Sequence, residues 1–495
     1  MKERILIVPP GTDNLLSWLR VQGVQVQADC GGKGSCGKCR VRIADGVFYD
    51  AEGKTATGTV LACQTWRSPQ GGRIVLPDAS GSGLTDFKKN PAALPRQAGT
   101  ALDIGTTTLA MVRVGPDGTI QDTQSALNPQ RSFGADVISR ITACTRGELS
   151  LLQEAVLGEI RQMLRKWDTA EDTLCVVGNP TMLHIFCGIS PEGIGRYPFQ
   201  PAFTGLLEKK GQELGLPVDR ILVLPQASAF IGSDITAGVL ACGMQQLDEP
   251  AVLMDIGTNG EMVLCMGRKR GGELYCASAA AGPALEGAGI SCGMGGVPGA
   301  VCRVTPRPVM SYQTIGDQPA AGLCGCGLID LAAALLTQGI LEPNGNLQED
   351  YELLGLHKDT SGRAMSVATG TGIELTQQDV RELQLAKSAL RAGLEALMSF
   401  AGVDAAALGR VYIAGGLGYY IDIANAVRIG LLPRELEQKT VTVGNSALSG
   451  AVSALGSQEA LRQMEEIAKS CETVELSQSE VFQRKFIEHM RFPEQ

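Results

Sequence analysis

The sequence LDIGTT at residues 102–107 recurs as MDIGTNG at residues 254–260, about 150 residues further along the chain. In both places an apolar run typical of a buried strand leads into Asp-Ile-Gly-Thr. Around the two copies, segments rich in Val, Ile and Leu alternate with helical patterns, most clearly at 149–167, 327–338 and 379–400. Such alternation is typical of βα units around mixed sheets. The repeat therefore predicts a duplicated α/β fold with a cleft between its halves.

Composition and charge limit the classes of function that the chain can serve. It has 495 residues, 44% of them apolar and 19% charged, so it can bury large cores and form several domains. The net charge is -9 and no run of Lys or Arg could follow a phosphate backbone, which argues against nucleic acid. No apolar stretch approaches the ~18 to 20 residues that cross a bilayer, and the start shows no signal-peptide core. We therefore expect a cytoplasmic protein with no membrane or nucleic-acid partner.

Three regions follow one another along the chain. Residues 1–77 combine short β-rich runs with one helical stretch, which predicts a small α+β module. Residues 78–99 show neither periodicity and carry several Gly and Pro residues, which is typical of a linker. Residues 100–495 hold the repeated motif, and we expect its two lobes at approximately 100–245 and 246–495.

A cysteine cluster lies inside the N-terminal module. Three of its cysteines follow the spacing Cys-x5-Cys-x2-Cys in a glycine-rich loop and a fourth stands on a later strand: Cys30, Cys36, Cys39 and Cys63. Four thiolates are what the two irons of a [2Fe-2S] cluster require, and glycines let backbone N–H groups point at the sulfides. These cysteines are therefore the predicted metal ligands, with a [2Fe-2S] cluster as cofactor.

A structural zinc site and unligated thiols are the alternatives for this cluster. Zinc modules usually pair two short Cys-x2-Cys knuckles, whereas here the fourth cysteine stands alone. The loop is one residue longer than the plant-type spacing, and this longer spacing resembles that of adrenodoxin-like ferredoxins. The resemblance implies a β-grasp, ferredoxin-like fold for residues 1–77.

The two Asp-Ile-Gly-Thr segments resemble the phosphate loops of the actin, hexokinase and heat-shock ATPase (ASKHA) superfamily. There, a β-hairpin holds phosphates through backbone N–H groups and threonine hydroxyls, while the aspartate orients Mg²⁺ through water. A polyphosphate needs many donors at close approach, which glycine permits, and a divalent ion to offset its charge. The resemblance implies a two-lobed ATPase domain at 100–495 that binds ATP and Mg²⁺ between its lobes.

Two further segments follow in the order of that superfamily. Residues 411–418 (VYIAGGLG) run from a strand into a Gly-Gly turn and resemble the adenosine-binding element. Residues 224–234 (LPQASAFIGSD) resemble the first connecting helix, where a Gln or Glu positions the attacking water. On this basis Gln226 is the predicted catalytic residue, with Asp234 as the runner-up. The predicted ATP and Mg²⁺ residues are Asp103, Gly105, Thr106, Thr107, Asp255, Gly257, Thr258, Asn259, Gly260, Gly415, Gly416 and Gly418.

The order of parts resembles the reductive activators of corrinoid-dependent methyltransferases, which join an N-terminal [2Fe-2S] domain to an actin-like ATPase domain. The most specific stretches are residues 128–140, 177–184, 280–287 and 482–493. The resemblance implies an ATP-hydrolysing electron-transfer enzyme that returns inactive Co(II) corrinoid to Co(I). It also implies a corrinoid protein or corrinoid-dependent methyltransferase as partner, and an upstream electron donor such as a ferredoxin or flavodoxin.

One departure from the family pattern concerns the linker. Larger members insert a further domain between the ferredoxin module and the ATPase core, and only the short linker stands in that place here. The dimeric state of the larger members should therefore not be assumed for this chain, and whether it forms a homodimer is left open.

Two other functions share some of these parts. One is an ASKHA small-molecule kinase with a redox-sensing ferredoxin domain, and the other is an ATP-driven activator of another low-potential enzyme. A kinase needs a carboxylate base beside a substrate pocket, and no such base is identifiable in the sequence. Known activators of radical enzymes bridge a dimer with a [4Fe-4S] cluster, whereas this chain holds its own four-cysteine loop.

Two other features have a structural interpretation. His184 lies in an apolar, helix-like run and is expected to be a satisfied core residue rather than a cobalt ligand. Cys324 and Cys326 lack the loop geometry of the cluster cysteines and are expected to serve packing.

Overall fold

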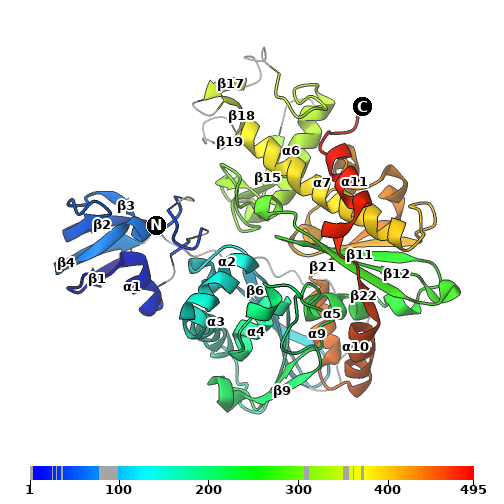
Figure 1. The fold of residues 1–495 in the computed structure, drawn as a ribbon, viewed down its shortest axis with the longest axis horizontal. Helices are drawn as coiled ribbons and strands as arrows, with labels where there is room; N and C mark the ends of the chain where they lie inside the picture. The colour runs from blue at the N-terminus through cyan, green and yellow to red at the C-terminus, as the bar shows by residue number, and fades with distance from the viewer. Residues whose placement is uncertain are drawn as a thin grey trace.

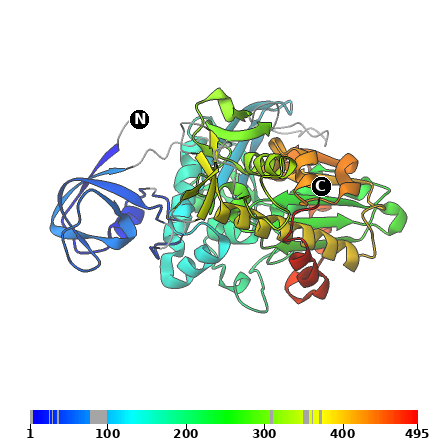
Figure 2. The ribbon, with the colours of Figure 1, turned by 90° about the horizontal axis from the view of Figure 1, so that it is seen from above.

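The computed structural model has three parts, an N-terminal module and two larger lobes (Figure 1). It describes residues 4–24, 26–28, 30–34, 37–76, 98–305, 311–348, 356–359, 362–368 and 373–494. Seen from above, the N-terminal module lies beside the first lobe and away from the second (Figure 2).

The N-terminal module is a four-stranded antiparallel sheet with one helix. Its strands, in spatial order, are β1 (Arg4–Val8), β4 (Thr65–Leu76), β2 (Arg40–Asp50) and β3 (Thr59–Leu61). Helix α1 (Leu15–Val21) begins at Asn14, whose side chain accepts hydrogen bonds from two N–H groups of the first turn. Its apolar face packs on the sheet around Phe48 and Ile74. The predicted α+β character of this module is confirmed.

The first lobe is built on a six-stranded mixed sheet. Its strands, in spatial order, are β7 (Ile120–Leu127), β6 (Thr108–Val114), β5 (Gly99–Ile104), β8 (Thr173–Gly178), β10 (Arg220–Val223) and β9 (Leu207–Lys210). Alternate residues of each strand point to opposite faces, so Leu102 and Ile104 pack with one set of helices and Ala101 with another. The first set is α2 (Val137–Ala143), α3 (Leu149–Leu164) and α4 (Pro180–Cys187).

The second lobe repeats this arrangement on its own six-stranded sheet. Its strands, in spatial order, are β21 (Thr440–Gly444), β20 (Arg410–Ala414), β11 (Ala251–Ile256), β12 (Gly260–Cys265), β13 (Leu274–Ala279) and β22 (Cys471–Thr473). One face packs on α6 (Gly325–Thr337) and α7 (Gln377–Phe400), and the other on α5 (Ser233–Ala241) and α10 (Gln458–Ser470). Strands β5 and β11, which carry the repeated motif, hold equivalent places in the two sheets.

Two helices cross between the lobes. Helix α5 follows the first sheet in the chain but packs on the second through Ile235 and Val239. Helix α9 (Ser446–Ala454) follows the second sheet but packs on the first through Ala447 and Ala451. The two helices contact each other between the sheets. The C-terminal part of the chain therefore completes the core of the first lobe.

Smaller elements surround the second lobe. They are β14 (Ala300–Thr305), β15 (Ser311–Thr314), β16 (Gly322–Leu323), β17 (Leu356–Asp359), β18 (Gly362–Ala368), β19 (Ile373–Thr376), α8 (Ile423–Arg428) and α11 (Glu480–Glu488). The helices predicted at 149–167, 327–338 and 379–400 correspond to α3, α6 and α7. Within the described ranges, no helix combines the length and apolar character that spanning a bilayer requires.

Candidate functional site

A cavity of about 240 Å³ lies between the lobes, where β5 and β11 each turn into a hairpin. Both turns are tight, because Gly105 N–H donates to Thr108 O at 2.9 Å and Gly257 N–H to Asn259 O at 2.9 Å. The sequence predicted this arrangement of two facing loops. The predicted site residues that line the cavity are Asp103, Gly105, Thr106, Thr107, Asp234, Asp255, Gly257, Thr258, Asn259, Gly415 and Gly416.

Three predicted residues lie behind the cavity wall. Gly260 starts β12, where an added Cβ would lie 2.0 Å from the Leu390 side chain. Gly418 faces the backbone of β20 and β21, with an added Cβ only 2.9 Å from Ile413 O. Both glycines therefore permit close packing that supports the loops.

The third is Gln226, the residue predicted to position water. Its side chain is fully buried, and its Nε2 donates to Phe203 O at 2.6 Å. It does not line the cavity, whereas Asp234, eight residues later at the start of α5, does. The structure thus places the runner-up in the cleft and the first choice outside it.

Five carboxyl groups line the cavity, Glu286 and a group of four with raised pKa values: Asp103, Asp234, Asp255 and Glu261. Burial raises the pKa of Asp103 to about 6, although a hydrogen bond from Asn445 opposes the shift. Burial, assisted by the charges of Asp103 and Glu286, raises the pKa of Asp255 to about 7. Burial and neighbouring carboxylates also raise the pKa values of Asp234 and Glu261 well above their usual range. Among the described residues, no Lys or Arg offsets these charges, so the cavity wall is acidic. No three of these carboxyl groups lie close enough together to form a direct metal site within the described part of the chain.

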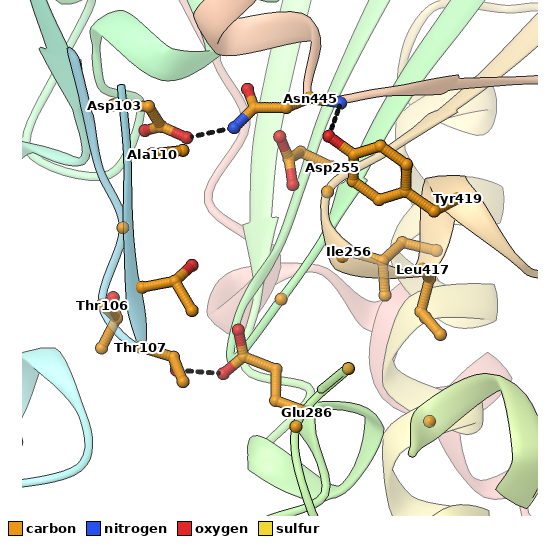
Figure 3. A pocket seen from close by; sticks show the side chains of 18 of the residues that line it. Asp103, Thr106, Thr107, Ala110, Asp255, Ile256, Glu286, Leu417, Tyr419 and Asn445 are labelled. Carbon is orange, nitrogen blue, oxygen red and sulfur yellow. Dashed lines mark hydrogen bonds between the residues drawn. The ribbon is translucent and has the colours of Figure 1, made fainter. Parts of the chain in front are cut away.

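Threonine hydroxyls from both loops converge on Glu286, which the sequence analysis did not single out as a site residue. Thr107 donates to Glu286 Oε2 at 2.9 Å (Figure 3). Thr258 donates to the same oxygen. Glu286 ends the short 3-10 helix Pro283–Glu286 of the second lobe. One carboxylate thus accepts hydrogen bonds from both lobes at the place where phosphate donors are expected.

Asn445, Tyr419 and Asn179 are further cavity residues that sequence reasoning missed. Asn445 Nδ2 donates to Asp103 Oδ2 at 2.6 Å, while its backbone N–H donates to the Tyr419 hydroxyl at 3.2 Å (Figure 3). Asn179 Nδ2 donates to Thr106 Oγ1 at 3.0 Å. Asn445 and Asn179 also cap α9 and α4, so the Asn that precedes each helical pattern was the available signal.

The Gly-Gly turn after β20 approaches the second phosphate loop closely. Gly415 has φ +81°, and an added Cβ would lie 2.5 Å from Asp255 Oδ1. Any other residue at this position would push against the carboxylate.

The cysteine loop is described at Cys30, Cys39 and Cys63, whereas Cys36 lies outside the described residues. Cys63 N–H donates to Cys39 Sγ at 3.5 Å, and the Gly34 backbone hydrogen-bonds the Cys63 thiol. Burial and the two neighbouring cysteines raise the pKa of the Cys63 thiol to about 12. Loop glycines with left-handed backbones give the tight curvature: Gly31, Gly32, Gly34 and Gly37. Close thiols with backbone donors aimed at sulfur fit a metal–sulfur cluster.

The two structural interpretations from the sequence have different outcomes. His184 is fully buried, its Nδ1 lies 2.7 Å from Pro180 O, and its Nε2 accepts from Ala202 N–H at 2.9 Å, so it is a satisfied core residue as predicted. Cys324 and Cys326 belong to the buried core of the second lobe and also line the cavity, so their packing role stays a prediction.

Family models match nearly the whole chain. Residues 98–247 match the RACo middle region, and residues 249–495 match the C-terminal domain of RACo, the ASKHA domain. Residues 2–66 match the 2Fe-2S iron-sulfur cluster binding domain. The chain belongs to the family of reductive activators of corrinoid proteins. The family resemblance and the fold class expected from the sequence are thereby confirmed.

Individual relatives in this family are similar over most of the chain. The corrinoid activation enzyme RamQ of Eubacterium limosum is 32% identical over 75% of this chain and 66% of its own length. The [Co(II) methylated amine-specific corrinoid protein] reductase of Methanosarcina barkeri is 28% identical over 79% of this chain and 76% of its own. A solved reductive activator for corrinoid, iron-sulfur protein superposes with a TM-score of 0.74 at 29% identity, covering 97% of this chain and 95% of that chain. This chain thus spans about two thirds to three quarters of the two sequence relatives.

Proposed function

We propose that this protein is an ATP-dependent reductive activator that passes one electron from a [2Fe-2S] cluster to Co(II) corrinoid protein and restores Co(I). One observation carries the proposal: a single chain holds both the cysteine loop of a 2Fe-2S module and a cleft with two facing phosphate loops. The named relatives act on corrinoid proteins, which supports a corrinoid protein or a corrinoid-dependent methyltransferase as the partner.

ATP would bind in the cleft with its phosphates between the two hairpin turns. The hydroxyls of Thr106, Thr107 and Thr258 and the backbone N–H groups of both loops supply donors for a polyphosphate. Asp103 and Asp255 would orient Mg²⁺, because both line the cavity, the charge of Asp103 acts on Asp255, and neither carries a basic partner among the described residues. Gly415 and Gly416 would lie at the adenosine.

Asp234 is the better candidate to position the attacking water. It lines the cavity near Asp103 and Asp255, and burial together with their charges keeps its pKa high. A carboxyl group with a raised pKa can hold or accept a proton near neutral pH. Gln226, whose amide is bonded to Phe203 O behind the wall, would support the loop that leads into α5.

Cys30, Cys36, Cys39 and Cys63 would hold the [2Fe-2S] cluster, which when bound supplies a one-electron redox centre. The chain itself contributes the glycine-rich loop, the Gly34 backbone donor and the burial of Cys39 and Cys63. We place this module at 1–77, the linker at 78–99 and the ATPase domain at 100–495. An upstream ferredoxin or flavodoxin would supply the electron, in a cytoplasmic setting.

ATP is needed because the reduction potential of the Co(II) corrinoid lies below that of an ordinary ferredoxin. A one-electron gap of about 100 to 200 mV corresponds to about 2.3 to 4.6 kcal/mol. Coupling of that size can come from nucleotide-dependent binding of the Co(II) partner.

The deciding experiment mixes the reduced holoprotein with Co(II) corrinoid proteins from the same organism, with and without Mg²⁺–ATP, and follows the Co(I) absorbance. We expect Co(I) to accumulate only with nucleotide, and the Co(II) form to stimulate ATP hydrolysis more than the Co(I) form. Equal yields of Co(I) with and without ATP would leave electron transfer alone as the function. Transfer of phosphate to a small molecule instead would indicate a kinase.

A further inference from the structure

An arginine of the N-terminal module contacts the first lobe. Arg20 lies in the last turn of α1, and its Nε donates to Ser132 O of the first lobe at 2.8 Å. Its second guanidinium nitrogen donates to the same oxygen, and its Cζ lies 4.8 Å from the centre of the Phe133 ring. Phe133 is itself buried in the core of the lobe, so the arginine rests on a fixed surface.

The same arginine lies beside the cysteine loop. An added Cβ at Gly32 would lie 3.8 Å from the Arg20 guanidinium and 3.9 Å from Cys63 Cβ. An added Cβ at Gly31 would lie 3.0 Å from Phe133 O, so the loop itself approaches the first lobe. The contact with Ser132 and Phe133 therefore lies at the cluster end of the module.

The segment that receives Arg20 is bonded to the first phosphate loop. Asn128, which caps this segment, donates its backbone N–H to Thr107 O at 2.8 Å and its Nδ2 to Gly105 O at 2.7 Å. Arg140, which is fully buried, also connects this segment to the first phosphate loop. Its guanidinium donates to Gly134 O at 3.0 Å and to Thr106 O at 2.6 Å. Residues 128–134 thus lie directly between Arg20 and the phosphate loop.

We propose that Arg20 docks the iron–sulfur module on residues 128–134 and that nucleotide binding at the first phosphate loop loosens this docking. The inference rests on the proposed binding of ATP between the lobes and of a cluster at the cysteine loop. Phosphates draw the N–H and hydroxyl donors of Gly105 to Thr107 toward the cleft. The carbonyls of these residues, to which Asn128 and Arg140 donate, move with them. Release of the module would free the cysteine loop to approach a partner.

Thermodynamic linkage means that the effect of ATP on docking can also be measured as an effect of docking on ATP affinity. If ATP loosens docking by some factor, loss of docking must tighten ATP binding by the same factor. Removal of a charged donor with two hydrogen bonds should weaken docking by about 10-fold or more. We therefore expect Arg20→Gln to bind Mg²⁺–ATP several-fold more tightly than the unaltered chain, and to lose the effect of nucleotide on docking.

The experiment measures hydrogen exchange of α1 and of residues 128–134, together with small-angle scattering, in the holoprotein with and without a non-hydrolysable ATP analogue. In the unaltered chain we expect the nucleotide to increase exchange in both segments and to enlarge the particle. Arg20→Gln should show the enlarged state already without nucleotide. Arg73→Gln is the matched control, because it removes the same charge from an exposed ion pair with Asp45 on the same module.

The outcomes distinguish failure of the proposed function from failure of the docking inference. Failure of the unaltered chain to bind nucleotide would count against the proposed function. Binding with unchanged or increased protection of both segments would overturn the docking inference, as would an Arg20→Gln variant that behaves like Arg73→Gln. If Arg20→Gln loses the [2Fe-2S] absorption, Phe133→Leu serves instead, because it removes the ring under the guanidinium without altering the module. It must then reproduce the enlarged, nucleotide-insensitive state, and failure to do so overturns the inference.

Discussion

Asp255 is the residue on which the proposed chemistry depends most directly. Its carboxylate lies at the end of β11 beside Gly415, and any Mg²⁺ bound between the loops must face it. Loss of a group that orients a metal typically costs about 10- to 100-fold in affinity or activity. We expect Asp255→Asn to lose ATP hydrolysis by at least this factor, in a steady-state phosphate-release assay.

The cluster should be unaffected by that substitution, because Cys30, Cys39 and Cys63 belong to a separate module with its own core. Asp248→Asn is a suitable control, since the exposed Asp248 side chain forms an ion pair with Arg268 outside the cavity lining. Hydrolysis at the same rate in both variants would remove the cleft carboxylates from the mechanism.

The raised pKa values of the cleft carboxyls predict a pH effect on nucleotide binding. Asp103, with a pKa of about 6, and Asp255, with a pKa of about 7, are partly protonated at pH 6 and must ionise to face Mg²⁺. Binding should therefore release protons at pH 6, release fewer at pH 8, and tighten as the pH rises between these values. Calorimetric titrations in buffers of different ionisation enthalpy measure this release. Equal proton release by Asp255→Asn and the unaltered chain would contradict the assignment.

The same raised pKa values predict how the stability of the nucleotide-free protein changes with pH. Because the folded pKa values exceed the usual aspartate value of 3.8, the nucleotide-free folded state binds more protons than the unfolded state between about pH 4 and 7. The stability contributed by these two groups is full below pH 3.8 and declines as the pH rises through 7. Mg²⁺–ATP, which favours the ionised forms, should restore it.

These two aspartates could be predicted from the sequence, whereas Glu286 and Asn445 could not be assigned to the site. Asp103 and Asp255 belong to short motifs in which the turn and the chemistry lie within six residues or so. Asn445 bonds Asp103 across 342 positions of chain, and Glu286 bonds Thr107 across 179. Gln226 lies in a motif of the expected type, yet its amide donates to Phe203 O outside the cavity. Side-chain direction depends on tertiary packing, which a motif does not specify.

At the scale of elements, α7 holds the C-terminal tail through polar side chains. Gln384 Nε2 donates to Met490 O at 2.7 Å, and Ser388 donates to Phe486 O. Lys387 is fully buried and donates to Arg491 O at 2.7 Å and to His489 O. Its ammonium also lies 4.9 Å from the centre of the Phe492 ring. Carbonyls at the end of α11 thus find donors on another helix rather than in water.

Lys387→Met should therefore destabilise the protein. The substitution keeps the apolar stem but leaves two partly buried carbonyls without their donor, at a cost of about 1–3 kcal/mol in the free energy of unfolding. Burial of the ammonium group is itself costly, and this cost lowers the pKa of Lys387 to about 7. Methionine removes that cost, which keeps the loss of stability within this range. Urea denaturation measures it, and hydrogen exchange should show the loss at α11. Lys469→Met, which alters an exposed side chain, should change stability by less than about 0.5 kcal/mol.

Element patterns also show where sequence reasoning ends. Helices α3 and α7 follow from their periodicity, because each has an apolar stripe long enough to be detected locally. Helix α6 is buried on every side and follows from its long apolar run. Helix α9 consists mostly of small residues and is buried on every side, so periodicity cannot tell that this helix crosses to the first sheet. A boundary between lobes drawn along the chain therefore assigns α9 to the second lobe, although it completes the core of the first.

At the scale of the whole molecule, the two lobes are joined across the cleft by Glu286. Its carboxylate accepts hydrogen bonds from Thr107 of the first lobe and Thr258 of the second. These are the hydroxyls that we assign to the phosphates of ATP, so nucleotide must displace the carboxylate when it binds. If ATP binds there, we expect Glu286 to compete with its phosphates for these hydroxyls.

Glu286→Gln should consequently raise the affinity for Mg²⁺–ATP. The amide oxygen can still accept hydrogen bonds from the hydroxyls, but a neutral acceptor is about 1 kcal/mol weaker than a carboxylate, and its repulsion toward phosphate is gone. We expect binding to tighten about five-fold or more by titration calorimetry, since 1.4 kcal/mol corresponds to ten-fold. Scattering should show a wider cleft in the nucleotide-free variant than in the unaltered chain. The matched control is Glu273→Gln, which removes the same charge from an exposed side chain just before β13. Weaker binding in Glu286→Gln would mean that this carboxylate helps to hold Mg²⁺ with Asp255 instead of competing with phosphate.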